Sequence, residues 1–206
     1  MQVSRRLVGH EGVESLLWVT ADRGAFGSER DGPLYDWLVD SPAFLASVSD
    51  RRVVVQAGGN CGMYPRFYKN YFDEVYTFEP DEINFYCLDQ NCQGAGYHKY
   101  LGALGESAGT ASLQHSHESN VGMHRIVDHP GSVRVYAIDE LRLEVCDLIH
   151  LDVELYEERV LRGALDTIER LSPVIITEIG NGKELLRSLG YERTYVGRYD
   201  HVFTKT

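Results

Sequence analysis

The chain has 206 residues, which fits one compact domain, and its 20 Lys and Arg against 31 Asp and Glu give a formal net charge of −11. This balance argues against a broad basic surface for nucleic acid, because binding to phosphates requires clustered cations. Hydrophobic residues make up 43% and charged residues 25% of the chain, a composition typical of a folded globular protein and not of a disordered one.

The cysteines and the lack of long apolar runs indicate the compartment. The cysteines form no Cys-x-x-Cys pair, and we expect reduced thiols that fill the core: Cys61, Cys87, Cys92 and Cys146. No run approaches the roughly 18 apolar residues of a membrane span, and the N-terminus lacks the pattern of a signal peptide. These features predict a cytoplasmic protein without a membrane span.

The elements expected along the chain form an N-terminal extension and then an alternating series. The extension holds a strand over 16–19 and a helix over 35–46. The later strands are expected over 53–55, 75–78, 97–104, 147–153 and 174–176, followed by a hairpin of 191–196 with 201–204. The later helices are expected over 63–72, 81–91, 160–171 and 183–189. Two stretches look irregular, 20–33 and 114–131.

This alternation is typical of an α/β fold: a Rossmann-like, doubly wound and mostly parallel seven-stranded sheet with a C-terminal antiparallel hairpin. We assign residues 52–206 to this domain and residues 1–51 to an N-terminal cap, within one compact unit. Such sheets bind ligands at the carboxyl ends of their strands, so the residues that directly follow each strand are the candidates for function.

A glycine-rich loop, Gln-Ala-Gly-Gly-Asn-Cys-Gly over 56–62, follows the first strand of the expected sheet. Glycines let a backbone turn sharply and approach a ligand closely, although a tight turn without a ligand has a similar composition. The spacing fits neither the G-x-G-x-x-G loop of dinucleotide-binding proteins nor the phosphate loop G-x-x-x-x-G-K-[ST]. It fits G-x-[GN]-x-G at Gly58, Asn60 and Gly62, and with Gly59 these residues are our candidates for a cofactor loop.

An acid, Glu79, ends the second strand of the expected sheet. In a nucleoside site, a carboxylate at this position accepts hydrogen bonds from both ribose hydroxyls, and charge-assisted bonds of this kind contribute about 1.5–3 kcal/mol each. A solvated carboxylate at a strand end is the alternative. Pro80 and Asp81 follow, and we count them as candidate neighbours of the adenosine.

In their order and spacing, these motifs resemble the FkbM-type family of class I S-adenosylmethionine-dependent methyltransferases. That family reads approximately D-V-G-A-N-x-G, then V-x-x-F-E-P, then L-x-x-N; this chain has QAGGNCG, then VYTFEP over 75–80, then LDQN over 88–91. The resemblance resumes at IDEL over 138–141, continues through 147–157 and 160–164, and covers residues 53–204 in all. It implies S-adenosylmethionine as the cofactor.

Three positions depart from the family pattern. Gln56 stands where the family has an acid that helps to hold the methionine amino end of the cofactor, so it can accept a hydrogen bond there but brings no charge. His150 stands where a lysine is usual, and Leu155 stands where the family has glycine.

The fourth strand of the expected sheet carries the candidates for catalysis. Alternation along a strand places His150, Asp152 and Glu154 on one face, and three titratable groups there suit acid–base work or cation binding. Asp152 is the leading candidate for contact with the acceptor hydroxyl, with His150 or Glu154 beside it. Alternatively, the two acids fix the following loop and the histidine is packed in the sheet. Glu157 and Glu178 are secondary candidates for the same cleft.

The second irregular stretch contains four histidines, His115, His117, His124 and His129. Histidine is a common metal ligand, but the spacing matches no closed zinc site and no cysteine takes part. We therefore predict no metal site and expect a polar loop that covers the cleft as a lid or acceptor-binding segment. A divalent ion in this loop is the lesser alternative.

The sequence thus predicts an enzyme that moves a methyl group from S-adenosylmethionine to a hydroxyl of a small molecule or glycan, with a sugar suggested by the resemblance. The charge argues against nucleic acid as the acceptor. A non-catalytic nucleoside- or partner-binding module of the same fold is the alternative, motivated by Gln56 and the altered loop after the fourth strand. A nicotinamide-dependent oxidoreductase is disfavoured by the glycine spacing.

Overall fold

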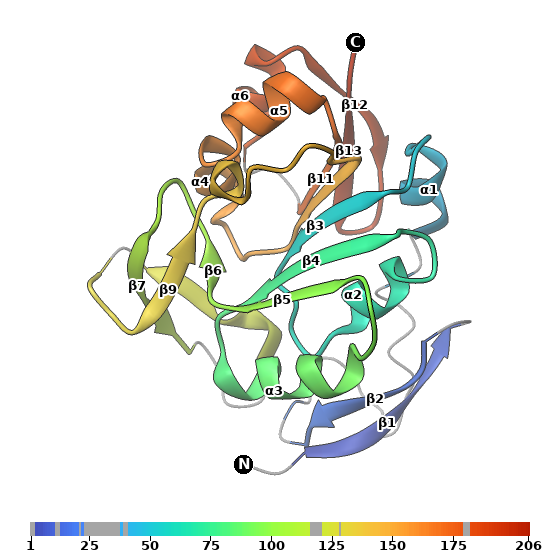
Figure 1. Cartoon of the computed structure of the whole chain (residues 1–206), viewed down its shortest axis with the longest axis vertical. Helices are drawn as coiled ribbons and strands as arrows, with labels where there is room; N and C mark the ends of the chain where they lie inside the picture. The colour runs from blue at the N-terminus through green and yellow to red at the C-terminus, as the bar shows by residue number, and fades with distance from the viewer. Residues whose placement is uncertain are drawn as a thin grey trace.

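The computed structural model describes residues 3–10, 13–20, 22, 38, 41–115, 121–127, 129–178 and 182–206. Most of the irregular stretch expected over 20–33, and most of the first part of the helix expected over 35–46, lie outside these ranges. Within them, the chain forms a large central sheet, a small sheet beside it and an N-terminal hairpin (Figure 1).

In the described part of the chain, seven strands form the central sheet in the order β12-β13-β11-β10-β3-β4-β5. Their bounds are β3 (Val53–Ala57), β4 (Glu74–Glu79), β5 (Tyr97–Leu101), β10 (Leu148–Leu151), β11 (Val174–Glu178), β12 (Tyr191–Val196) and β13 (Asp200–Lys205). Neighbouring strands run parallel except at β13, which pairs antiparallel with β11 and β12. The predicted fold class, with its C-terminal antiparallel hairpin, is confirmed. The strand order reverses between β3 and β10, where such sheets bind ligands.

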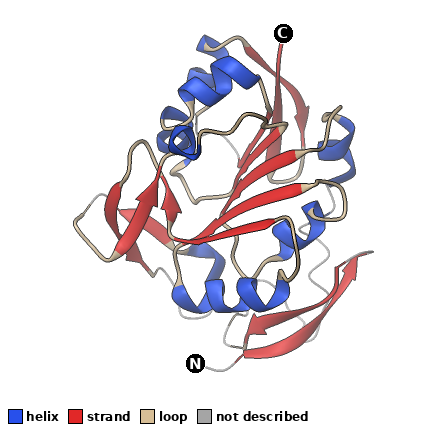
Figure 2. Ribbon diagram, in the orientation of Figure 1, coloured by secondary structure: helices blue, strands red, loops and turns tan. Residues whose placement is uncertain are grey.

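Helices cover both faces of the central sheet (Figure 2). Their bounds are α1 (Ser41–Ala46), α2 (Met63–Tyr68), α3 (Glu82–Asn91), α4 (Glu157–Arg162), α5 (Leu165–Leu171) and α6 (Lys183–Ser188). Helices α1–α3 pack on one face with Val54 and Leu148, and α4–α6 pack on the other with Val55 and Ile149. Because both faces are buried, the strands are apolar at successive positions. None of the helices described here is long and apolar enough to cross a membrane.

The helix expected over 160–171 is two helices, because the chain breaks at Gly163 between α4 and α5. A β-carbon at Gly163 would overlap the carbonyl oxygen of Gly105, so the two backbones approach more closely than a side chain allows. The Gly163 carbonyl also accepts a hydrogen bond from the amide of Asp139, at 2.9 Å. A contact between distant segments therefore overrides the helical period of the apolar residues.

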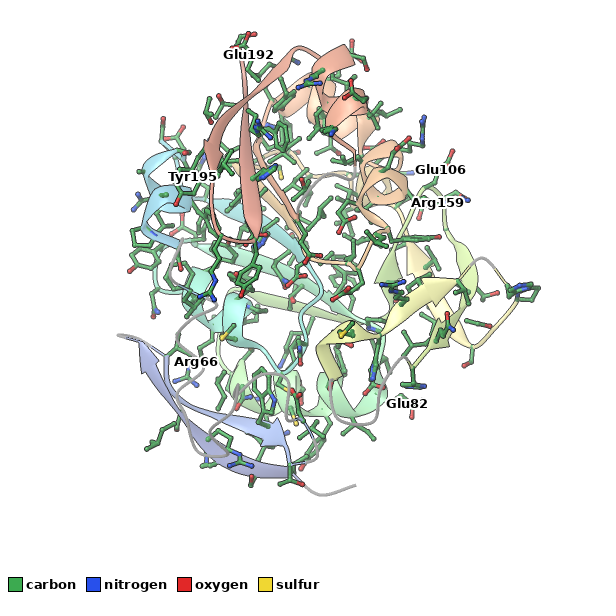
Figure 3. All side chains as sticks on the ribbon, turned by 180° about the vertical axis from the view of Figure 1, so that it is seen from behind. Arg66, Glu82, Glu106, Arg159, Glu192 and Tyr195 are labelled. Atoms are coloured by element: carbon green, nitrogen blue, oxygen red, sulfur yellow. The ribbon has the colours of Figure 1, made fainter. Side chains whose placement is uncertain are left out.

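A small sheet flanks the stretch expected to be irregular over 114–131. Its strands are β6 (Ala103–Leu104), β7 (Gly109–Gln114), β8 (Arg125–Val127) and β9 (Val133–Tyr136), in the order β6-β9-β7-β8, with 3₁₀ turns η3 (Val121–Met123) and η4 (Ile138–Leu141). Strand β8 and the last residue of β7 lie within the stretch expected to be irregular. The strand expected over 97–104 is also divided, because Gly102 takes a φ of 155° between β5 and β6. Figure 3 shows Glu106, before β7, next to Arg159 of α4; their charged atoms are 3.8 Å apart.

The N-terminal hairpin, β1 (Val3–His10) and β2 (Val13–Val19), lies along α3 (Figure 1). Leu16 and Trp18 of β2 are buried in the same apolar cluster as Val54 of the central sheet. The hairpin therefore shares the core of the sheet. The division of the chain into a cap and a methyltransferase domain at residue 51 stays a prediction.

Asn91, the last residue of α3, binds the hairpin with its side chain. Its Oδ1 accepts a hydrogen bond from the amide of Leu17 at 2.7 Å, and its Nδ2 donates to the Leu17 carbonyl at 2.8 Å. The same Nδ2 donates to the carbonyl of Cys61 in the glycine loop, at 2.7 Å. One carboxamide thus connects the hairpin, α3 and the loop after β3.

Candidate functional site

A cavity opens where β3, β4 and β10 end, at the carboxyl edge of the central sheet. Most of the residues predicted for cofactor binding and catalysis line it: Gly58, Gly59, Asn60, Glu79, Pro80, Asp152 and Glu154. Of the secondary candidates, Glu178 lines the cavity as well. Five predicted residues do not line it: Gln56, Gly62, Asp81, His150 and Glu157. The structure therefore brings the glycine loop, the acid at the end of β4 and the acids after β10 to one place.

The glycine loop bends back over the sheet through residues with left-handed backbone. Gly58 has a φ of 81° and Asn60 a φ of 46°. The amides of Gly58 and Gly59 donate to the carbonyl of Phe78 on β4, at 3.2 and 2.9 Å. A β-carbon at Gly58 would overlap the carbonyl oxygen of Asp152, so glycine is required for this approach of the β3 and β10 ends.

Gln56 lies behind the glycine loop and is fully buried. Its Nε2 donates to the carbonyls of Ala57 and Gly58, at 3.0 and 2.9 Å, and its Oε1 accepts a hydrogen bond from the Thr77 hydroxyl at 2.8 Å. The amide therefore holds the backbone of the loop. An acid at this position would lack the N–H groups that make two of these three bonds.

Glu79 lies at the cavity with both carboxylate oxygens oriented by backbone amides. Its Oε2 accepts from the amide of Asn60 at 2.7 Å, and its Oε1 accepts from the amide of Asp81 at 2.9 Å. Burial raises the pKa of the Glu79 carboxyl to about 7, although the hydrogen bonds from the two amides favour the charged form. The structure thus holds a nearly buried carboxyl group in one fixed orientation next to the glycine loop.

Three acids from the loop after β10 and the end of β11 meet at the cavity. Asp152, Glu154 and Glu178 each place a carboxylate oxygen within 4.8 Å of the others. Burial raises the pKa of Asp152 well above its usual range, and the neighbouring charges of Asp200 and Glu178 add to this. Burial and neighbouring acids raise the pKa values of Glu154 and Glu178 as well. Such groups can hold or accept a proton closer to neutral pH than exposed carboxylates do.

Strand β10 ends at Leu151, which changes the predicted arrangement of the acids. Asp152 and Glu154 belong to the loop before α4, and Glu154 and Leu155 both take positive φ values, 52° and 73°. The prediction that His150, Asp152 and Glu154 share one strand face is therefore wrong. Alternation stops where the strand ends, and the loop itself carries the acids to the cavity.

His150 is fully buried in an aromatic layer between β10 and α2. Its Nδ1 lies 2.8 Å from the hydroxyl of Tyr68, and its ring packs edge-on against Phe44 and Tyr64, with ring centroids 5.8 and 4.5 Å away. Tyr64 lines the cavity, so His150 supports the cavity wall from behind. This is the placement of a packed strand histidine, the alternative that the sequence left open.

Asp81 caps α3 and does not line the cavity. Its Oδ1 accepts hydrogen bonds from the amides of Ile83 and Asn84, at 2.9 and 3.0 Å, as N-cap aspartates do. Its Oδ2 faces two imidazoles, 3.0 Å from His115 Nε2 and 3.5 Å from His124 Nδ1. Burial favours a higher pKa for Asp81, but the hydrogen bonds from the Asn84 amide and from His115 outweigh it, so the pKa is lowered.

The second irregular stretch contributes to the cavity wall, at Gly122, Met123, His124 and Ile126. Burial is the main cause that lowers the pKa of His124. His117 lies outside the described residues. The expectation that this stretch borders the cleft is thus met where the structure describes it.

Further wall residues come from segments that sequence reasoning did not connect with the site. Tyr156 precedes α4 and Tyr199 lies between β12 and β13. Asp22 also lines the cavity and accepts a hydrogen bond from the Trp18 indole at 2.8 Å. No local pattern marks these positions, because tertiary structure alone brings them to the cavity.

Comparison with known proteins gives a family. The model of the methyltransferase FkbM domain matches residues 58–196 of the chain. This range contains most of the cavity-lining residues, from the glycine loop to Glu178. None of the curated proteins matches the sequence.

Two solved structures share the fold. Methyltransferase FkbM from Methylobacillus flagellatus KT aligns with a TM-score of 0.51 and 16% sequence identity, over 79% of this chain and 49% of that chain. The chain therefore spans about half the length of that protein. A ribosomal protein L11 methylase from Lactobacillus delbrueckii subsp. bulgaricus aligns with a TM-score of 0.52 and 10% identity, over 98% of this chain and 99% of that chain.

Proposed function

The chain belongs to the FkbM methyltransferase family, and we propose that it moves a methyl group from S-adenosylmethionine to a hydroxyl of a small molecule or glycan. The observation that carries this proposal is the geometry of Glu79. Its carboxylate lies at the cavity beside the glycine loop and is oriented by amides of Asn60 and Asp81.

Glu79 suits the ribose of the cofactor. A carboxylate oxygen accepts more than one hydrogen bond, so each oxygen keeps acceptor capacity after it has bound a backbone amide. The two ribose hydroxyls would use this capacity. Gly58 and Gly59 border the same cavity with backbone instead of side chains, which leaves room for a close approach of the methionine part of the cofactor.

The acids Asp152, Glu154 and Glu178 suit the acceptor. When bound, S-adenosylmethionine would supply a methyl group on a positively charged sulfur; the acceptor oxygen would take the methyl group as the sulfur–carbon bond breaks, and S-adenosylhomocysteine would leave. Asp152 takes up the proton of the acceptor hydroxyl, and its raised pKa supports this assignment. Glu154 and Glu178 add negative charge beside it, which favours the cationic sulfur. His150 acts through Tyr64, as a positioning residue.

The placement of Gln56 favours one alternative, a non-catalytic module that binds nucleosides. The Gln56 amide is fully buried, binds Ala57, Gly58 and Thr77, and does not line the cavity, so this side chain does not reach the methionine amino end of a cofactor. A protein of this kind would still hold the adenosine through Glu79. Cofactor binding alone therefore does not distinguish the two functions.

Two experiments test the proposal. Calorimetry with S-adenosylmethionine, S-adenosylhomocysteine and NAD tests the cofactor, and the proposal fails if NAD binds while neither sulfur nucleoside does. Transfer of a labelled methyl group into small-molecule and glycan fractions of an extract of the source organism tests the reaction. Label that appears with the wild type and is lost with Asp152→Asn supports the enzyme. Cofactor binding without any transfer supports the non-catalytic module, and label in the nucleic acid contradicts the proposed acceptor.

A further inference from the structure

Two histidines from separate segments converge on one carboxylate oxygen of Asp81. His115, directly after β7, places its Nε2 3.0 Å from Asp81 Oδ2, and His124, directly after η3, places its Nδ1 3.5 Å from the same oxygen. The two imidazole rings meet edge to face, with centroids 4.4 Å apart. The ligand atoms of all three residues lie within 4.8 Å of one another.

The N-terminus of α3 holds Asp81 in a suitable orientation. Its Oδ1 is occupied by the amides of Ile83 and Asn84, and its own amide donates to Glu79. These bonds fix the carboxylate plane, so Oδ2 points to the histidines without a further loss of side-chain freedom. A ligand oriented in advance binds an ion more strongly than a mobile one.

His124 gives the second, independent observation. Its side chain is only 10% exposed, and its Nδ1 has no hydrogen-bond partner, although it faces Asp81 Oδ2. A buried nitrogen without a partner is unfavourable and rare in folded proteins. An ion between His124, Asp81 and His115 would give this nitrogen a partner.

We propose that Asp81, His115 and His124 bind one divalent transition-metal ion of the Zn²⁺ class. Zn²⁺ binds imidazole nitrogens and carboxylate oxygens at about 2.0–2.2 Å, so two ligands of a tetrahedral site lie about 3.3–3.6 Å apart. The separations of 3.0 and 3.5 Å from Asp81 Oδ2 are close to this range. Imidazole ligands select Zn²⁺ and its neighbours in the first transition row over Mg²⁺ and Ca²⁺, which prefer oxygen.

The ion would connect the small sheet to the N-terminus of α3. His115 follows β7 and His124 precedes β8, whereas Asp81 begins α3, 34 residues before His115. His124 also lines the cavity, so the ion would fix this part of the cavity wall. This inference departs from the sequence prediction of no metal site. It goes beyond the proposed function and does not depend on methyl transfer.

Metal titration tests the site directly. Protein without a histidine tag is treated with EDTA, freed of the chelator and titrated with Zn²⁺ by calorimetry in the absence of nucleosides. We expect one equivalent to bind to the wild type, and at least tenfold weaker binding to His115→Ala and to His124→Ala. His129→Ala is the matched control, because His129 is exposed in the same region and lies outside the cluster. It should bind Zn²⁺ as the wild type does.

Thermal unfolding provides a second readout. Saturating Zn²⁺ should raise the Tm of the wild type and of His129→Ala but not that of His124→Ala, since an ion that binds only the folded state stabilises it. If a histidine variant does not fold, Asp81→Asn replaces it, because asparagine keeps the N-cap and removes the charge. The proposal is wrong if the wild type binds no stoichiometric Zn²⁺, or if the histidine and Asp81 variants bind it as tightly as the wild type.

Discussion

The carbonyl oxygen of Asp152 occupies the space that a β-carbon on Gly58 would fill. The amide of Asp152 also donates to the carbonyl of Ala57, at 3.1 Å, so a hydrogen bond joins the ends of β3 and β10 next to this contact. The glycine loop and the loop that carries the acids are therefore one packed unit. A substitution at Gly58 should therefore alter the conformation of both loops.

Gly58→Ala should destabilise the protein through steric overlap as well as through its positive φ. Strain at a left-handed residue costs about 1–3 kcal/mol, and each kcal/mol lowers the Tm of a protein of this size by about 2–4 °C. Gly190→Ala is the control, because Gly190 has nearly the same φ, 82° against 81°, with nothing within 4 Å of the added carbon. Thermal unfolding should show a clearly larger loss for Gly58→Ala. Equal decreases in Tm would mean that the backbone at Asp152 moves away from the added carbon at little cost in stability.

Removing the carboxylate of Glu79 should weaken the binding of S-adenosylmethionine at least tenfold, which corresponds to about 1.4 kcal/mol. Glu82→Ala is the matched control, since Glu82 lies near Glu79 in sequence but is exposed at the start of α3 (Figure 3). Calorimetry on Glu79→Ala and Glu82→Ala gives the comparison. Unchanged affinity in a folded Glu79→Ala would remove the ribose assignment.

The stability of the protein should fall as the pH rises through the acid cluster's titration range. The pKa of Asp152 is raised in the folded state above the value of about 3.9 expected in the unfolded chain. The folded state therefore holds its proton longer, and this contribution is complete below the unfolded pKa and lost as the pH passes the folded pKa. The raised pKa values of Glu154 and Glu178 act with the same sign.

Asp152→Asn should reduce this pH dependence, because asparagine does not titrate. Its Tm relative to the wild type should be higher at pH 8 than at pH 5, while methyl transfer is lost. Asp73→Asn serves as the control, because Asp73 is exposed and remote from the cluster. A parallel pH profile for wild type and Asp152→Asn would show that the Asp152 carboxyl titrates alike in the folded and unfolded chains.

Restoring an acid at Gln56, as the family pattern suggests, should destabilise this protein. Gln56→Glu removes the two N–H groups that bind the carbonyls of Ala57 and Gly58 and buries a carboxyl against them. The Ala57 carbonyl keeps its bond from the Asp152 amide, whereas the Gly58 carbonyl loses its partner. A buried group left without a partner costs about 1–3 kcal/mol, so the Tm should fall by at least about 2 °C. Gln90→Glu, on the exposed side of α3, controls for the added negative charge. An unchanged Tm would mean that the loop rearranges to accept the acid.

Local patterns were sufficient to predict the central sheet and the glycine loop that borders the cavity. The apolar run over 53–55, the spacing of Gly58, Asn60 and Gly62, and the acid at Glu79 are properties of short segments. Parallel strands end at one edge of the sheet. The sheet alone therefore brings these segments together at the cavity.

The remaining features depend on contacts between distant segments. The break between α4 and α5 results from the approach of Gly163 to Gly105, which the helical period of the apolar residues does not reveal. His115 and His124 meet Asp81 only because the small sheet folds beside α3. The spacing of residues along the chain does not predict these contacts.

The carboxamide of Asn91 connects the N-terminal hairpin to the glycine loop. It pairs with both backbone groups of Leu17 and with the carbonyl of Cys61, so a displacement of Asn91 would break its bonds to both segments. Hydrogen exchange at the Leu17 amide should therefore respond to changes in the glycine loop that move the Asn91 side chain. A nucleoside that slows this exchange would be detected at a residue it never touches.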